Sequence, residues 1–338
     1  MRRGHEKTII FVSILGLLAL GIASVCMGRF SISGSELWDM VMDRLRGVSA
    51  GTNAEIVLWQ ARVPRIIVAI LIGICLSLSG AAYQGVFRNP MVSPDILGAS
   101  AGAGFGAALG FLLGLPTLTV QLMAFAAGSA AVFLTWGLHR LMGAEDASDK
   151  MFLILSGIVT GALFQAMISI IKYVADPYDT MPSIAFWLMG GLNYVTDTDV
   201  KFLLIPAVLG SVPLLLIRWR LNLLAFETDE AESMGINIKK YRGIVMICST
   251  MMTAACVAVG GMIGWVGLIV PHFARMAVGP DYKKMLPCAA VFGGAFMLLV
   301  DDLARCLFAQ ELPIGILTAL VGAPVFAVLL MRGRKGFI

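Results

Sequence analysis

The sequence predicts an all-α protein that crosses a membrane many times, and three observations support this prediction. Hydrophobic residues occupy 59% of the 338 positions and charged residues only 14%. Mean hydropathy is +0.88, whereas soluble globular chains carry about 45–50% apolar and about 25% charged residues. Apolar runs of about 20 residues, the length that crosses a bilayer as a helix, recur along the whole chain. We therefore expect a single transmembrane domain over residues 1–338.

About ten apolar runs are candidates for membrane spans. The longer runs cover residues 9–28, 66–87, 96–115, 117–138, 151–171, 243–262 and 312–331. Shorter candidates are residues 202–217, 263–274 and 285–300. The first run follows "MRRGHEK" and resembles a signal peptide, with Cys26 open to a lipoprotein interpretation. Val25 is a poor cleavage residue and the run is long enough to span by itself, so we expect an uncleaved first span.

The basic residues predict how the chain is oriented. Most of the 25 Lys and Arg fall in segments that share one side of the membrane with the N-terminus. The excess of Lys and Arg in cytoplasmic loops places both termini in the cytoplasm, in agreement with an even number of spans. The net charge of +4 is explained by this asymmetry, and we expect no nucleic-acid partner.

A polar break separates the second and third runs. The stretch "RNPMVSPDILGASAGAGFGAALG" has two prolines among its first seven residues, and neither can lie inside a regular helix without loss of hydrogen bonds. A turn of this kind either connects helices outside the membrane or, at membrane depth, lines a cavity. The glycines that follow are four residues apart and share one helix face, which suits close helix packing or a helix that slides during function. They are Gly98, Gly102, Gly106 and Gly110.

Several motifs that would indicate an energy source are missing from the sequence. It contains no GxxxxGK[ST] phosphate loop and no HExxH pair. Acidic residues in mid-span, which proton- or sodium-driven carriers usually need, are nearly absent. The exception is "VDDLARC", in which Asp301 and Arg305 are spaced to pair on one helix face. We interpret this as a neutralised pair rather than a proton relay, so the chain resembles a pore that is driven by another protein.

The segment 218–242 is the longest predicted cytoplasmic loop. Acidic residues begin a short helical pattern that Gly235 ends and that Lys239 and Lys240 follow, an order that suits the helix dipole. An amphipathic helix that is not strongly basic favours a protein partner over lipid headgroups. A solvated connector is the alternative.

Six motifs in the same order resemble the permease subunits of binding-protein-dependent ABC importers for iron–siderophores, haem and cobalamin (FecCD-type). They are "RVPR" at 62–65, "SGAAYQGVFRNPMVSPDILGASAGAG" at 79–104, "ETDEAESMGI" at 227–236, "GWVGLIVPHFARMAVGPDYKKMLP" at 264–287, "DDLAR" at 301–305 and "ELPIGILTALVGAPVFAVLL" at 311–330. The resemblance implies a type II importer fold in a prokaryotic cell (inner) membrane. It also implies a homodimer that works with two ATP-binding cassette ATPases and a substrate-binding protein. ATP and Mg would bind to the ATPases, and we expect this chain to bind no cofactor or metal and to be no enzyme.

The resemblance also implies roles for individual residues. Asn89 and Met91, with Ser148 and Lys150, would form the cytoplasmic gate, and Arg62, Arg65 and Arg305 would dock the substrate-binding protein. Arginines that extend toward the membrane surface are the alternative for this last group. The residues implied to couple to the ATPase are Glu227, Asp229, Glu230, Glu232, Ser233, Met234, Gly235 and Ile236.

The expected cargo is a metal complex such as an iron–siderophore, haem or cobalamin. Residues 172–192 resemble a subset of these permeases that includes ones for oxyanions, so molybdate or tungstate is the alternative cargo. A secondary transporter is disfavoured by the lack of acids within spans, and an intramembrane enzyme would need a polar catalytic pair there.

Overall fold

The computed structural model describes residues 3–28, 30, 32–47, 51–141, 149–225, 237–307 and 310–333. Every regular element in these ranges is a helix. Seven segments are long and apolar enough to cross a membrane. They contain α1 (Arg3–Cys26), α4 (Val63–Phe87), α6 (Thr117–Leu141), α7 (Asp149–Val174), α9 (Asp197–Leu216), α12 (Ile238–Gly260) and α14 (Tyr282–Cys306).

The remaining helices have at most 20 residues each. They are α2 (Gly34–Leu45), α3 (Asn53–Ile56), α5 (Ala99–Leu112), α8 (Thr180–Met189), α10 (Arg218–Leu221), α13 (Val266–Val278) and α15 (Ile314–Gly333). Two further short helical segments are η1 (Val57–Arg62) and η2 (Asn222–Ala225). The all-α membrane fold predicted from the sequence is confirmed, although the expected ten spans include two, at 96–115 and 263–274, that form only the half-length helices α5 and α13. The sequence did not predict α2, α3 or α8.

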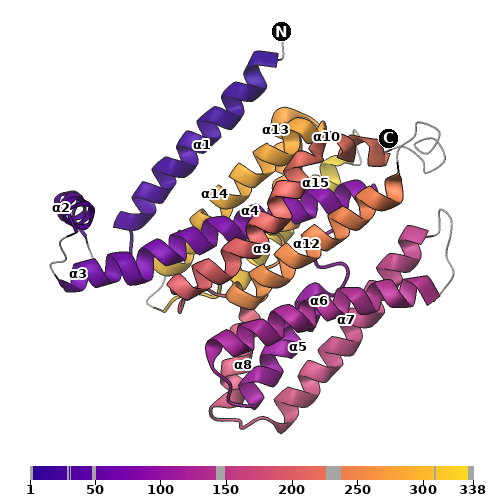
Figure 1. Cartoon of the computed structure of the whole chain (residues 1–338), viewed down its shortest axis with the longest axis horizontal. Coiled ribbons are helices and arrows are strands. Elements are labelled where there is room, and N and C mark those ends of the chain that lie inside the picture. The colour runs from indigo at the N-terminus through magenta and orange to yellow at the C-terminus, as the bar shows by residue number, and fades with distance from the viewer. Residues whose placement is uncertain are drawn as a thin grey trace.

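Helix α4 lies at the centre of the bundle and packs against α9, α12, α13 and α14 (Figure 1). Its glycines bring backbones into direct contact: a Cβ at Gly80 would lie 1.8 Å from the carbonyl oxygen of Gly267, and one at Gly73 would lie 2.1 Å from that of Gly293. Close backbone approach replaces the hydrophobic drive that is missing between helices in lipid. Any side chain at these positions would separate the helices.

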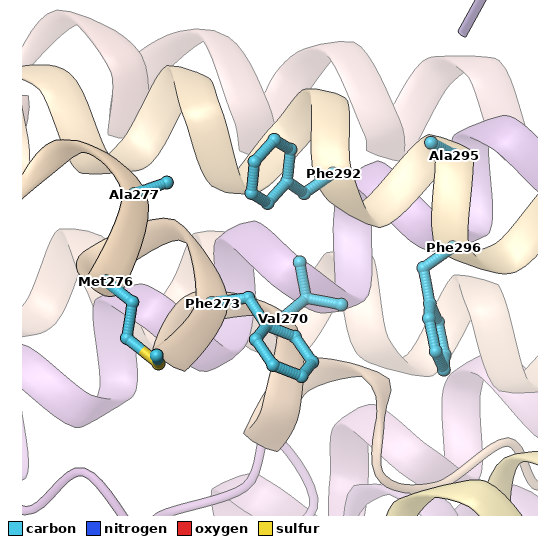
Figure 2. A pocket seen from close by; sticks show the side chains of 7 residues that line it. All are labelled: Val270, Phe273, Met276, Ala277, Phe292, Ala295 and Phe296. Carbon is cyan, nitrogen blue, oxygen red and sulfur yellow. The ribbon is translucent and has the colours of Figure 1, made fainter. Parts of the chain in front are cut away.

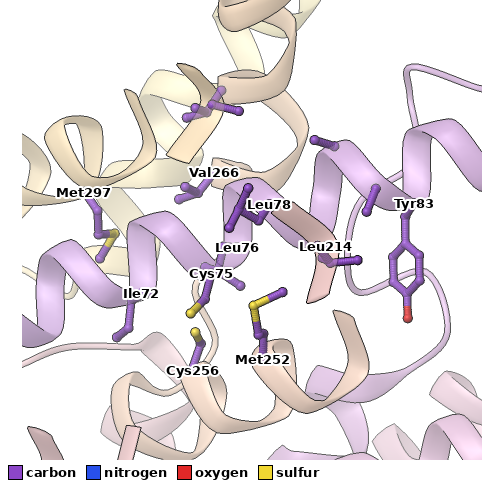
Figure 3. Packing of buried hydrophobic residues seen from close by; sticks show 14 of the residues in the cluster. Ile72, Cys75, Leu76, Leu78, Tyr83, Leu214, Met252, Cys256, Val266 and Met297 are labelled. Atoms are coloured by element: carbon purple, nitrogen blue, oxygen red, sulfur yellow. The ribbon is translucent and has the colours of Figure 1, made fainter. Parts of the chain in front are cut away.

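The core along α4 is built from apolar side chains and small thiols (Figure 3). Cys75 on α4 and Cys256 on α12 are buried with their sulfur atoms facing each other, beside Ile72 and Met252. A second group of helices, α5 to α8, lies beside this core, and α12 packs against both α5 and α6 (Figure 1). Helix α12 therefore joins the core around α4 to the group formed by α5 to α8.

The bundle has two ends, which we call the turn end and the arginine end. The turn end carries the turn at residues 88–98, η2 and Asp281, whereas the arginine end carries Arg62, Arg65 and Arg305. Glu6 near the start of α1 forms an ion pair of 2.5 Å with Lys284 at the start of α14. The described N- and C-terminal residues both lie at the turn end (Figure 1).

Candidate functional site

Arg65 lies at the arginine end and is paired within the chain. Its Nε lies 3.0 and 3.1 Å from the two carboxylate oxygens of Asp301 on α14. Its Nη1 donates to Glu311, just before α15, over 2.8 Å. Arg65 therefore connects α4 to α14 and to the start of α15.

Arg305 extends the same network toward α1. The ion pair with Asp301 predicted from their spacing is confirmed, with Nε 3.3 Å from a carboxylate oxygen. Arg305 also pairs with Asp302 and donates to the hydroxyl of Ser24 over 2.8 Å. The Ser24 hydroxyl in turn donates to Asp302 over 2.6 Å. Four charged groups, from Arg65, Arg305, Asp301 and Asp302, are thus buried together and neutralise one another.

Arg62 is held by backbone carbonyls instead of carboxylates. It ends the π-helix η1, a type of segment frequent at functional sites. Its guanidinium donates to the carbonyl oxygen of Val25 over 2.5 Å and to that of Phe30. The three arginines predicted to dock a partner are only 5–8% exposed in this chain. Their docking role stays a prediction, and the exposed part of the network is Glu311, whose side chain is 27% exposed.

The contacts of Asp301 with Arg65 and of Arg65 with Glu311 were missed in the sequence analysis. The paired residues are 236 and 246 positions apart, so no local spacing indicates them. Glu311 stands first in "ELPIGIL", and an acid beside an apolar run was the one available signal.

The predicted gate residues Asn89 and Met91 lie in the turn that follows α4. The Asn89 side-chain oxygen accepts a hydrogen bond of 2.9 Å from the N–H of Met91, whose side chain is 45% exposed. Arg88 begins the turn in the left-handed conformation, with φ of 51°. Gln84 supports the turn from α4 by donating weakly to the carbonyl of Val92 over 3.5 Å. The geometry gives an ordered turn with an exposed methionine at its tip.

The other predicted gate and coupling residues lie mostly outside the described part of the chain. Ser148 and the coupling set at 227–236 belong to those ranges, and of Lys150 only the backbone, in α7, is described. Their roles remain predictions.

The glycines spaced four residues apart on α5 face α6. A Cβ at Gly102 would lie 2.5 Å from Cβ of Ala131, and one at Gly106 would lie 2.3 Å from the carbonyl oxygen of Met123. Gly110 similarly meets Val120, whereas Gly98 precedes α5 in the left-handed conformation, at φ of 83°. Three of the four glycines therefore let α5 and α6 approach closely.

An apolar groove of about 510 Å³ opens between α13 and α14 (Figure 2). Phe273, Phe292 and Phe296 line it together with small and aliphatic side chains. Apart from the thioether sulfur of Met276, a soft metal ligand, this lining offers no group that binds a metal or an anion. The described part of the chain also holds no group of three His, Cys, Asp or Glu side chains that could bind a metal ion.

The described bundle of apolar, glycine-packed helices, with its buried charges neutralised at one end, is that of a multi-pass membrane protein. The chain belongs to the FecCD transport family, whose model matches residues 16–332. It is an ABC importer permease of that family.

Individual relatives differ in their named cargo. The chain is 37% identical to the molybdate import system permease protein MolB of Haemophilus influenzae, over 99% of each chain. It is 35% identical to an iron chelatin transport system permease protein of Helicobacter pylori, over 84% of this chain and 85% of the relative. A solved structure of an inward-facing metal-chelate type ABC transporter shares 35% identity and a TM-score of 0.84, covering 97% of this chain and 99% of that one.

Proposed function

We propose that this chain is the membrane subunit of an ATP-driven importer that carries a metal-containing anion, in the first place molybdate or tungstate, into the cytoplasm. The observation that supports this cargo is the 37% identity to the Haemophilus influenzae molybdate permease over almost the full length of both chains. Metal chelates, the cargo expected from the sequence motifs, are the second candidate because of the relative named for iron chelatin transport and the metal-chelate type structure.

The energy source is proposed to be a separate pair of ATP-binding cassette ATPases. The chain has no phosphate-binding loop of its own. The carboxylates buried in the described part of the bundle also have partners: Asp301 and Asp302 pair with arginines, and Asp199 accepts from Gln121. Glu55, in α3, accepts from the N–H of Gly51. A proton- or sodium-driven carrier needs an exchangeable acid within the membrane, so the geometry favours ATP over an ion gradient.

The proposed assembly contains two copies of this chain, two ATPases and one substrate-binding protein. The large apolar residues exposed on α7 and α15, such as Ile158, Val159, Leu320 and Val321, suit contact with a second copy or with lipid. The turn end would face the cytoplasm and the arginine end the outside, as the distribution of basic residues predicts.

An uptake assay distinguishes the two cargo classes. The complex is reconstituted into proteoliposomes with its ATPase and binding protein, and ATP-dependent uptake of radioactive molybdate is compared with that of a ferric siderophore. We expect molybdate uptake that excess tungstate suppresses. Uptake of the siderophore alone would replace the oxyanion with a chelate as cargo and leave the importer class standing.

A further inference from the structure

A chain of hydrogen bonds at the turn end leads from the predicted gate to the residues just before the predicted ATPase-coupling segment. We propose that Arg88 is a positioning residue that transmits movement of η2 to the turn at residues 88–98. The inference rests on the proposed function and adds to it the residue that joins ATPase and gate.

The first link joins Arg88 to η2. Arg88 directly follows α4 as its C-cap, and its Nε donates to the carbonyl oxygen of Leu224 over 2.9 Å. Leu221 and Leu224 are buried in the core. Leu224 lies in η2 and Leu221 is the last residue of α10, directly before it. Because these buried side chains fix both, the backbone of η2 moves together with the core beneath it, and Arg88 is bonded to that backbone.

The second link joins η2 to α14. The side-chain amide of Asn222 donates to Asp281 over 2.8 Å, and its oxygen accepts from the N–H of Tyr282 over 3.0 Å. Asp281 also caps α14 by accepting from the N–H of Lys283 over 3.0 Å. The η2 segment is therefore held from one side by α4 and from the other by α14.

The third link leads through α13 back to the turn at residues 88–98, which we call the gate turn. Arg275 on α13 donates to the side-chain oxygen of Gln84 over 2.9 Å. Gln84 donates to the carbonyl of Leu268 over 3.3 Å and approaches that of Val92 at 3.5 Å. Tyr282 packs against α4 beside Gln84, since its hydroxyl would lie 2.9 Å from a Cβ at Gly85. The gate turn and η2 are thus connected through hydrogen bonds to the same neighbouring helices.

The backbone of Arg88 explains why this link suits a moving part. Arg88 and Trp265 are the non-glycine residues with positive φ in the described part of the chain. Such a conformation persists where surrounding contacts enforce it, and it is frequent in switch regions. Asn89 follows directly, and its carbonyl accepts from the N–H of Val92 over 3.3 Å. A pull on the Arg88 side chain therefore acts on the first residue of the gate turn.

The test measures gate movement without any cargo. A cysteine replaces Met91 in a background in which the exposed Cys26 and Cys306 are serine. Labelling by a membrane-impermeant maleimide is followed in the complex with the ATPase, with and without ATP and vanadate. The variants are Arg88→Asn and Arg88→Gly, which accept positive φ but lack the guanidinium, so they remove the hydrogen bond and keep the backbone. Arg140→Asn is the matched control, because Arg140 stacks on Trp136 at 4.6 Å near the end of α6, where Thr135 donates to the carbonyl of Leu97 in the turn over 3.0 Å.

We expect nucleotide to change the labelling rate of the cysteine at position 91 in the parent, which carries no change at Arg88, and in Arg140→Asn. In both Arg88 variants the nucleotide dependence should vanish while the ATPase still hydrolyses ATP. Retention of the full dependence in the Arg88 variants would overturn the inference. If these variants fail to assemble, Asn222→Asp tests the second link, since it places a second carboxylate against Asp281. An unchanged nucleotide dependence of labelling in Asn222→Asp would also overturn the inference. Failure of the parent chain to bind any ATP-binding cassette subunit would instead overturn the proposed function.

Discussion

Replacement of Asp301 by asparagine tests whether the arginine end is held together by its buried charges. Asp301 is fully buried and contacts both Arg65 and Arg305, with nitrogen–oxygen distances of 2.9 to 3.3 Å. Asparagine keeps the size of the side chain and removes its charge. Two guanidinium groups then share the remaining carboxylates, Asp302 and Glu311.

The expected loss follows from the burial. Removing one partner of a buried ion pair costs about 3–5 kcal/mol where the other charge is left without compensation. In Asp301→Asn, Arg65 keeps only the part-exposed Glu311 and Arg305 keeps only Asp302, so we expect a loss of at most that size. Glu311→Gln is the matched control at the same arginine, since Glu311 is 27% exposed and such a pair contributes about 0–1 kcal/mol. We therefore expect Asp301→Asn to destabilise the protein far more than Glu311→Gln.

The assay is the thermal stability of the purified permease in detergent, followed by intrinsic fluorescence and size-exclusion profile. A double variant, Arg65→Met with Asp301→Leu, removes one charge of each sign and should be more stable than Asp301→Asn alone. Equal stability of Asp301→Asn and Glu311→Gln would refute the interpretation that buried charge compensation holds α4 to α14. So would a double variant that is no better than the single one.

Three further predictions concern other parts of the molecule. Gly102→Leu and Gly106→Leu should reduce the yield of folded protein, because each side chain would enter α6, whereas Gly137→Leu should not, since nothing lies within 4 Å of a Cβ there; equal yields of all three in detergent would contradict this. Glu311→Gln should strengthen binding of the substrate-binding protein if Arg65 docks it, because the variant removes a competing carboxylate; unchanged affinity at low salt, measured by surface plasmon resonance, would argue against Arg65 as a docking residue. Burial alone would raise the pKa of Asp281, but hydrogen bonds from Asn222 and Lys283 and the charges of Lys284 and Lys283 lower that pKa below its ordinary value. The stability contributed by ionised Asp281 should therefore be fully present above about pH 4 and be lost as the pH falls through the lowered pKa. Asp281→Asn should then be less stable than the unmutated chain at neutral pH, and this difference should shrink at low pH. A difference in thermal stability that stays the same at low pH would contradict the prediction.

Some of these features could be predicted from the sequence because they depend on local pattern. Composition and run length indicate a helical membrane protein, and the spacing of Asp301 and Arg305 indicates their ion pair. The start of α5 could not be predicted in this way, because residues 96–115 form an unbroken apolar run. The helix begins later because Gly98 adopts a left-handed conformation and Ile96 packs its carbonyl against Gly157 of α7.

The polar networks at the two ends of the bundle depend on contacts between distant segments. Arg88 and Leu224 are 136 positions apart, and Gln84 and Arg275 are 191 apart. Hydropathy and motif spacing carry no information about such pairs. The sequence indicated the arginines and the gate turn as candidates, but only the packing of α4 against α13 and α14 shows which groups face them.

We propose above all that this permease moves its cargo with energy from ATP that a separate subunit hydrolyses. The most direct measurement is uptake of radioactive molybdate into proteoliposomes that contain the permease, its ATPase and its binding protein, with ATP inside or outside and with or without an imposed proton or sodium gradient. We predict uptake that requires ATP on the side of the ATPase and is unaffected by collapse of the gradients. Uptake by the permease alone, driven by a gradient in the absence of ATP, would contradict the account.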